Sequence, residues 1–300
     1  MTMNVISKKF IIKQDTPSRA SKVFIERKTD RRSNEWIATV LIESDESYSN
    51  EQRFKTLSQI IDSIEKKTEH SGVILFPAGW FYEEGKKTKT LYEWVVKNVV
   101  KILQSKQRDL LIILGVDGRL TEDEIGIDQI AFAISKNGIE GLARKFHPTV
   151  EERDIIACAK NYLSTEEGKS RIVIFNARKL YLCVCYDVFG IKELKIDNPG
   201  VDFVLGLVHQ FYPKGEVLSD DDFFARHGFA GASKQWKCPV FGSVVFFRRD
   251  VPQQWPSAVM WNQGKKPTNQ WKYEDNPLTP LQKLHLKIEE GKAVVRMYTL

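Results

Sequence analysis

The sequence lacks the features that would place it in a membrane or in an oxidising compartment. Its 300 residues contain no apolar run that approaches the roughly 20 residues needed to cross a bilayer. Residues 1–15 include lysines but no apolar stretch followed by a small-residue cleavage site, so we expect no signal peptide. The four cysteines are too few for a disulfide framework and indicate reduced thiols. We therefore expect a cytoplasmic protein.

Metal-ligand patterns are also missing. Cys183 and Cys185 are two positions apart, whereas structural zinc sites place about two to four residues between paired cysteines and supply two further ligands. The sequence offers no matching His/Cys pair. We expect neither a metal nor a cofactor.

Beyond its N-terminal segment, the chain lacks an excess of charge of either sign. Residues 1–35 hold nine Lys or Arg against four acids, while the remainder holds 36 bases and 35 acids, for a net charge of +6. A nucleic-acid-binding protein normally carries its basic stripe on the folded body. We therefore interpret residues 1–35 as a solvated lead-in arm and do not expect a nucleic-acid partner.

What is present is the composition and element order of an α/β protein. Hydrophobic residues make up 42% and charged residues 28%, which is ordinary for a globular enzyme. Apolar runs at 36–43, 72–76 and 110–116 predict buried strands, and apolar residues at helical spacing predict helices over 50–64 and 91–102. This alternation predicts a sandwich with partly parallel strands that are buried on both faces.

The second half of the sequence predicts antiparallel pairs and shorter helices. We divide the chain into a lead-in over 1–35, one domain over 36–250, and a tail over 251–300 that packs on the core or on a partner subunit. The further predicted elements are a hairpin (128–135 with 139–144), a helix at 151–163, an antiparallel pair (171–176 with 179–185), a strand at 201–208, a helix from Ser219, a strand at 240–247, a helix at 278–288 and a strand at 293–298.

Cys185 is the first candidate for chemistry. It stands at the end of the apolar run 182–184 and is followed by Tyr186-Asp187. A strand-to-loop corner exposes a side chain beside backbone N–H groups that can hold a developing oxyanion. A thiol becomes a useful nucleophile only where a base or a cation favours the thiolate. Taken alone, a cysteine at a strand end is more often an inert packed residue.

Three further segments change this interpretation. Residues 73–77 read Val-Ile-Leu-Phe-Pro, residues 144–153 read Arg-Lys-Phe-His-Pro-Thr-Val-Glu-Glu-Arg, and residues 200–206 have the form of a strand returning to the core. In order and spacing, the chain over 36–250 resembles the nitrilase, or carbon–nitrogen hydrolase, superfamily. The lysine segment is similar to nitrilases in the narrow sense, whereas Cys-Tyr-Asp is similar to the amidase branches.

The resemblance implies a four-layer αββα sandwich in which two mixed sheets lie between helical layers. It implies that Cys185 is the nucleophile, that Lys145 stabilises the tetrahedral oxyanion, and that Glu152 lies where the family has its second glutamate. We expect six side chains to be buried between the layers: Phe76, Ile113, Ile174, Val184, Leu205 and Val245.

One position departs from the family pattern. Where the family has a general-base glutamate after Phe-Pro, this sequence has Ala78. A methyl group cannot move a proton, so the base would have to be Glu152 or an unexpected residue. Glu152 is either an acid near the site or a residue of a first helical turn. His147 and His209 could partner Cys185, or make ordinary hydrogen bonds. Glu83 and Glu84 could fold into the cleft, or form a solvated pair.

The sequence leaves more than one function open. The first hypothesis is an amidase-type hydrolase that cleaves a small amide through a Cys185 thioester. The second is a degenerate relative that binds a ligand or partner without turnover, which Ala78 favours. A nucleic-acid-associated protein using the basic arm is the third. We also expect a homodimer or higher oligomer, formed through residues 220–236 with Phe223, Phe224 and Phe229.

Overall fold

The computed structural model describes residues 35–45, 48–119, 126–216, 219–261, 277–289 and 291–300, and for Glu84 only the backbone. The predicted lead-in arm therefore lies outside the described residues, apart from Glu35. The N-terminal half contains β1 (Trp36–Ser44), α1 (Asn50–Glu65), β2 (Gly72–Leu75), β3 (Phe81–Lys87), α2 (Thr88–Gln104) and β4 (Leu110–Arg119). The predicted alternation of strands and helices is confirmed here.

The second half of the chain contains mostly strands. In chain order its elements are β5 (Ile127–Ser135), β6 (Gly138–Arg144), β7 (Ile156–Ala157), β8 (Ile172–Phe175), β9 (Arg178–Val184), α3 (Asp187–Glu193), β10 (Phe203–Phe211), α4 (Asp221–Phe223), the π-helical turn η1 (Phe224–Phe229), α5 (Ala230–Trp236), β11 (Val240–Phe247), β12 (Ala258–Val259), β13 (Gln282–Ile288) and β14 (Gly291–Thr299).

Two predicted helices are wrong. The segment 151–163 forms turns and the short strand β7, because its backbone bonds to other segments: the Ile127 N–H donates to Ile155 O, and the Ala159 N–H donates to Lys145 O. The segment 278–288 contains β13, which pairs antiparallel with β14. Its apolar residues Leu284, Leu286 and Ile288 are spaced by two, which is the period of a strand.

Hydrogen bonds join the main strands into one sheet, in the order β6-β5-β4-β2-β1-β11-β10-β9-β8. The pairs from β4 to β9 are parallel, whereas β4-β5-β6 and β8-β9 are antiparallel. β1 joins the two halves, because residues 36–39 pair with β2 and residues 41–44 pair with β11. The two predicted sheets are therefore connected. The C-terminal strand β14 also pairs with β1 along its whole length.

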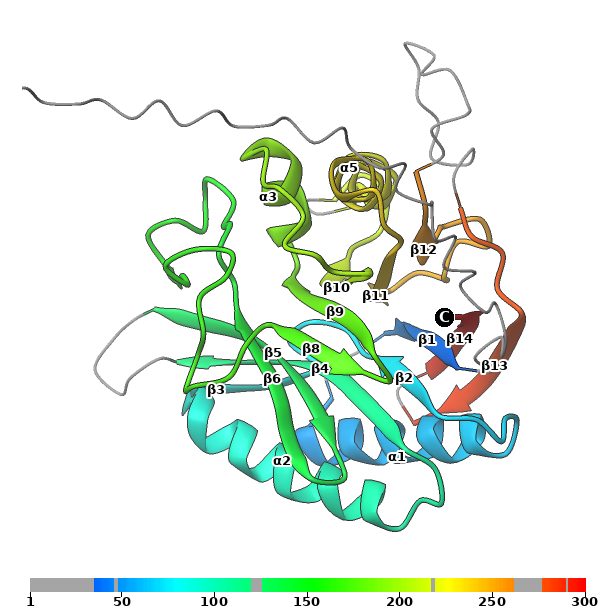
Figure 1. Ribbon diagram of the computed structural model, residues 1–300. Helices are drawn as coiled ribbons and strands as arrows, with labels where there is room; N and C mark the ends of the chain where they lie inside the picture. Colours follow the sequence, from blue (N-terminus) through cyan, green and yellow to red (C-terminus); the bar gives the residue numbers. More distant parts are fainter. Residues whose placement is uncertain (1–34, 46–47, 120–125, 217–218, 262–276, 290) are drawn as a thin grey trace, which may run out of the picture. The chain divides into compact units, whose positions relative to one another are not determined.

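Each half of the sheet has helices against one face. α1 and α2 cover one half of the sheet, and α3 and α5 cover the other (Figure 1). Apolar side chains of α1 and α2 are buried with those of β1, β2 and β4, and those of α3, η1 and α5 with those of β9, β10 and β11. A third cluster joins the two halves and includes Leu75 and Ile113 from one half and Leu182 and Leu205 from the other. The fold is thus a mixed α/β fold with one large sheet.

Most of the predicted core is buried. Phe76, Ile113, Val184 and Leu205 are fully or almost fully buried, and Val245 is half-buried. Ile174 is a correction, because its exposed fraction is 70%. It lies on β8 at the end of the strand order, where its neighbours Val173 and Phe175 point into the core, so alternation turns Ile174 to solvent.

Two further features bear on the expected reduced thiols and on the expected absence of a membrane span. All four cysteines are free thiols. In the described part of the chain, no helix has both the length and the apolar character that crossing a bilayer requires.

Candidate active site

Cys185 occupies a sharp corner between β9 and α3. Its φ is +47°, in the left-handed region that residues with a side chain seldom adopt, at a cost of about 1–3 kcal/mol. Its N–H donates to Leu207 O at 2.6 Å, which ties the corner to β10. The side chain is half-buried. The backbone therefore presents the thiol at the end of a strand in a fixed direction.

Asp187 holds this corner together with the loop that follows Lys145. Its buried carboxylate accepts hydrogen bonds from the Phe146 and His147 N–H groups at 2.8 and 2.9 Å, and from the Val184 N–H at 3.1 Å. Burial raises the pKa of Asp187, and this outweighs the opposing effects of Arg171 and the three N–H donors. The aspartate of the Cys-Tyr-Asp motif thus links the cysteine segment to the lysine segment.

Lys145 follows β6 and is completely buried. Its Nζ donates to Gln129 Oε1 at 3.0 Å and to Glu152 Oε2 at 2.5 Å. Burial acts to lower the pKa of Lys145, but the charges on Cys185 and Glu152 raise it overall. Lys145 is therefore a cation in the same site as the thiol.

Glu152 lies against Lys145. The same Oε2 atom that binds Nζ also accepts a hydrogen bond from the Thr149 N–H at 2.8 Å. Glu151, the alternative in the sequence register, is exposed. Of the two adjacent glutamates, Glu152 is the one that holds the lysine in place.

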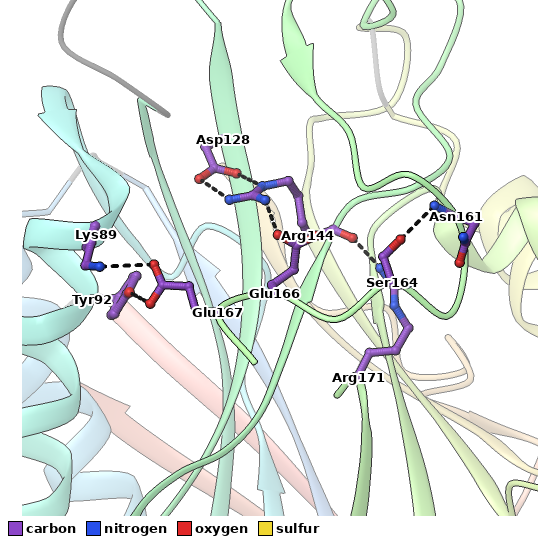
Figure 2. A network of polar contacts seen from close by, with 9 residues as sticks. All are labelled: Lys89, Tyr92, Asp128, Arg144, Asn161, Ser164, Glu166, Glu167 and Arg171. Carbon is purple, nitrogen blue, oxygen red and sulfur yellow. Dashed lines mark hydrogen bonds and ion pairs between the residues drawn. The ribbon is translucent and has the colours of Figure 1, made fainter. Parts of the chain in front are cut away.

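The residue before Lys145 belongs to a second polar network (Figure 2). The Arg144 guanidinium donates to both carboxylate oxygens of Asp128, at 2.7 and 3.2 Å, and also binds Glu166. Glu167 binds Tyr92 and Lys89 on α2, which anchors the loop after β7 to that helix. These contacts fix the strand end from which Lys145 extends.

His209 on β10 is the ionisable group that lowers the pKa of the thiol most strongly. Its Nε2 lies 2.9 Å from Asp117 Oδ2 on β4. Burial acts to raise the pKa of Cys185, but the charge and hydrogen bond of His209, together with the charge of Lys145, lower it overall. Burial acts in the opposite direction on His209, but Asp117 and Cys185 raise its pKa to about 10. The lowered pKa of Cys185 and the raised pKa of His209 together favour a Cys185 thiolate beside a His209 imidazolium.

The backbone at Ala78 and Gly79 leaves room for the side chains of His209 and Asp117. The Ala78 N–H donates to Val208 O at 3.1 Å, so this corner lies directly beside β10. Gly79 has φ +55°, and a Cβ there would lie 3.0 Å from both Asp117 Oδ2 and His209 Cδ2. Arg53 of α1 also holds the corner by donating to Gly79 O and Trp80 O. His209 and Asp117 thus border the Ala78–Gly79 corner closely.

A cavity of about 290 Å³ adjoins the same residues. Ala78, Gly79, Asp117 and His209 form part of its wall. Cys185 is not among the described residues that line it, whereas His209, which interacts with the thiol, is. The remainder of the wall includes Arg53, Trp80 and Tyr82.

Sequence reasoning did not identify Asp117, and it left His209 as one of two histidine candidates. Each is the first ionisable residue after an apolar run, 110–116 and 203–208, which is a signal that could have singled them out. In parallel sheets the carboxyl ends of neighbouring strands meet at one edge, where binding sites form.

Other candidate residues lie elsewhere. The second histidine, His147, contacts Glu193 at 2.9 Å, and Glu83 forms an exposed ion pair with Lys86. The Glu84 side chain lies outside the described residues. Among the residues that the structure describes, no group of three or more His, Cys, Asp or Glu side chains has the arrangement of a metal site.

No known family profile and no curated protein matches the sequence. Solved structures do match it over nearly the whole chain. A cysteine variant of the Nesterenkonia AN1 amidase, described as belonging to the nitrilase superfamily, has a TM-score of 0.59 at 12% identity over 90% of this chain and 92% of that chain. A carbon–nitrogen hydrolase from Helicobacter pylori G27 has a TM-score of 0.55 at 11% identity over 90% of each chain. At these identities the likeness shows the fold, which is of the nitrilase type.

Proposed function

We propose that this protein is a carbon–nitrogen hydrolase of the amidase type, acting on a small amide through a thioester on Cys185. The observation that carries the proposal is a thiol of lowered pKa, on a left-handed corner, beside the buried cation Lys145. The fold likeness supports it, because a structurally similar Nesterenkonia amidase has been solved with acrylamide and with butyramide. We extend the same proposal to a four-layer αββα arrangement, to a domain over 36–250, and to a cytoplasmic location.

The proposed reaction begins with attack of the Cys185 thiolate on the amide carbonyl carbon. Negative charge then develops on the carbonyl oxygen, where Lys145 Nζ and backbone N–H groups at the corner would stabilise it. A buried ammonium is effective here because the low local dielectric strengthens its attraction for the oxyanion. Glu152 and Gln129 would keep Nζ in position throughout.

The second candidate function is ligand binding without turnover, and Ala78 is the observation that favours it. We propose that Ala78 stands where the family resemblance places a general-base glutamate. Loss of a general base typically lowers a rate by about 10²–10⁴, so a protein with no replacement would be close to inactive. The two functions differ in whether another side chain moves the proton.

Ammonia release from a panel of small aliphatic amides, including acrylamide and butyramide, tests the proposal. We expect the wild-type protein to release ammonia and Cys185→Ala to fall to the background rate. The exposed thiol of Cys158 provides a matched control, because Cys158→Ala should keep the wild-type rate. Binding of these amides without ammonia release above that of Cys185→Ala would instead support the degenerate function.

A further inference from the structure

We propose that Cys185, His209 and Asp117 form a Cys–His–Asp triad in which His209 carries the proton during amide cleavage. The inference rests on the proposed hydrolase function and supplies the proton carrier that Ala78 cannot provide. It assigns Asp117 as a positioning residue that acts through His209. Asp117 lies on β4, Cys185 directly follows β9, and His209 lies on β10.

One ring nitrogen of His209 is bound to Asp117, which leaves the other for the thiol. Nε2 lies 2.9 Å from Asp117 Oδ2. The Cys185 N–H donates to Leu207 O at 2.6 Å, which places the thiol beside the stretch of β10 that carries His209, and each of the two side chains shifts the pKa of the other. With Nε2 on Asp117, Nδ1 is the ring nitrogen that remains for Sγ. A carboxylate on one nitrogen fixes the tautomer and orientation of the imidazole, so the other nitrogen can exchange a proton with a nucleophile.

A purely structural role accounts poorly for Asp117. Its Oδ2 binds His209, but its Oδ1 is buried without a hydrogen-bond partner among the described residues. A buried acceptor that makes no hydrogen bond destabilises the folded state. A carboxylate that served stability alone would accept hydrogen bonds at both oxygens. To orient the His209 imidazole and favour its protonated form, Asp117 needs only the hydrogen bond at Oδ2.

The other ionisable side chains near the thiol are already engaged. Glu152 Oε2 binds both Lys145 Nζ and the Thr149 N–H. His147 contacts Glu193 and stacks on Tyr186. Asp187 accepts three backbone N–H groups at the base of the corner. His209 is the group that interacts with the thiol, lowering its pKa, and that also lines the cavity.

The proton balance of the reaction follows from this arrangement. The Cys185 thiolate attacks the carbonyl carbon, and the π electrons move to oxygen. When the tetrahedral intermediate collapses, the C–N bond breaks and His209 Nδ1–H protonates the departing nitrogen, which leaves as ammonia or an amine. Neutral Nδ1 then takes a proton from water as the water oxygen attacks the thioester carbon. The C–S bond breaks, the carboxylic acid leaves, and the thiolate–imidazolium pair is restored.

Charged groups from several elements surround this pair. Asp117 on β4 faces His209, Lys145 after β6 faces the thiol, and Glu152 and Asp187 act through Lys145. Since Lys145 stays a cation, the thiolate has a second partner when His209 is removed. We therefore expect loss of His209 to raise the midpoint of thiolate formation without returning Cys185 to the reactivity of a buried neutral thiol.

Alkylation of Cys185 by iodoacetamide across a pH series, followed by peptide mapping, measures the thiolate without requiring turnover. In the wild type we expect the rate to rise at a pH below the ordinary thiol pKa of about 8.5. His209→Gln should raise this midpoint by at least about one pH unit, and Asp117→Asn should raise it by less. His285→Ala, on an exposed position of β13, should match the wild type. An unchanged midpoint in His209→Gln overturns the triad.

The rate of ammonia release is the second measurement. If the wild type releases ammonia from amides, His209→Gln should lower kcat/KM by about 10²–10⁴, and Asp117→Asn should lower it while also moving the pH profile. Wild-type turnover that survives His209→Gln but is lost in Glu152→Gln would overturn the triad and leave the hydrolase proposal standing. If the wild type releases no ammonia, the hydrolase proposal fails, and the alkylation midpoints still decide whether His209 and Cys185 form the pair. Asp117→Asn keeps the shape of its side chain and serves as the second variant if His209→Gln does not fold.

Discussion

Lys145 is the residue at which stability and chemistry depend on the same contacts. A lysine with no exposed side-chain surface is stable only if its ammonium is paired and hydrogen-bonded, and Glu152 and Gln129 provide these contacts. The cation in turn lowers the pKa of the thiol. Its removal therefore affects folding and reactivity together.

We expect Lys145→Met to lower the free energy of unfolding by about 3–5 kcal/mol, because the Glu152 carboxylate loses its partner. Urea unfolding measures this change. The double variant Lys145→Met/Glu152→Gln should recover part of the stability without recovering activity. Recovery of both properties would show that Lys145 serves the fold alone.

The residues of the site differ in how far the sequence could reveal them. Cys185, Lys145 and Glu152 lie in short motifs, so local sequence is enough to select them as candidates. Asp117 and His209 are 92 positions apart and meet only because β4 and β10 end near each other. A contact between distant strand ends depends on the strand order, which the sequence pattern does not specify.

The pH profile of turnover follows from the direction of two pKa shifts. The pKa of Cys185 is lowered, so activity should rise at a lower pH than for an ordinary thiol. The pKa of His209 is raised to about 10, so its proton should remain available for the leaving group until the pH passes through that value. Initial rates of ammonia release across the pH range check both limits. A profile that falls near the ordinary histidine pKa of about 6.5 would contradict this arrangement.

Among the elements, the pattern of burial along each strand explains why the central strands were predicted correctly, why Ile174 of β8 was wrongly placed in the core and why β13 was mistaken for a helix. Apolar runs identified the central strands, because these strands are buried on both faces. β8 and β13 lie where only one face is covered, and there periodicity decides which residues are buried. The sequence predicted an antiparallel pair that includes 171–176 and a buried Ile174, but alternation along β8 turns this residue outward.

β8 therefore offers a matched pair of substitutions. Val173 is almost fully buried in the cluster between the two sheet halves, whereas Ile174 is mostly exposed. We expect Val173→Ala to lower the free energy of unfolding by about 1–3 kcal/mol and Ile174→Ala to change it by less than about 0.5 kcal/mol. Equal effects in urea unfolding would show that β8 is paired in a different register.

At the scale of the whole molecule, the aromatic residues near α5 need a revised interpretation. Phe224 and Phe229 are buried within the chain, so of the three phenylalanines proposed for a subunit contact only Phe223 is available, with an exposed fraction of 46%. The two buried rings pack edge-to-face on each other, and Phe229 also packs on Trp255. Phe224 also packs on Phe211 of β10, which joins η1 to the sheet.

Self-association remains a prediction, with Phe223 as its test residue. We expect sedimentation at micromolar concentration to give a dimer. Phe223→Asp should shift the protein toward monomer, because a charge disfavours a closed apolar interface. Leu281→Asp, at an exposed position beside β13, is the matched control and should leave the dimer intact. A wild-type monomer under these conditions would contradict the prediction.

The proposed hydrolysis depends on a thioester between Cys185 and the acyl group of an amide substrate. Rapid acid quench of the wild-type protein during reaction with butyramide, followed by peptide mapping, detects this intermediate directly. We expect an acyl group on the Cys185 peptide, absent from Cys185→Ala, and its transfer to hydroxylamine as a hydroxamate when that nucleophile replaces water. Ammonia release that continues in Cys185→Ala, or a wild-type protein that yields neither acyl peptide, hydroxamate nor ammonia, would contradict this mechanism.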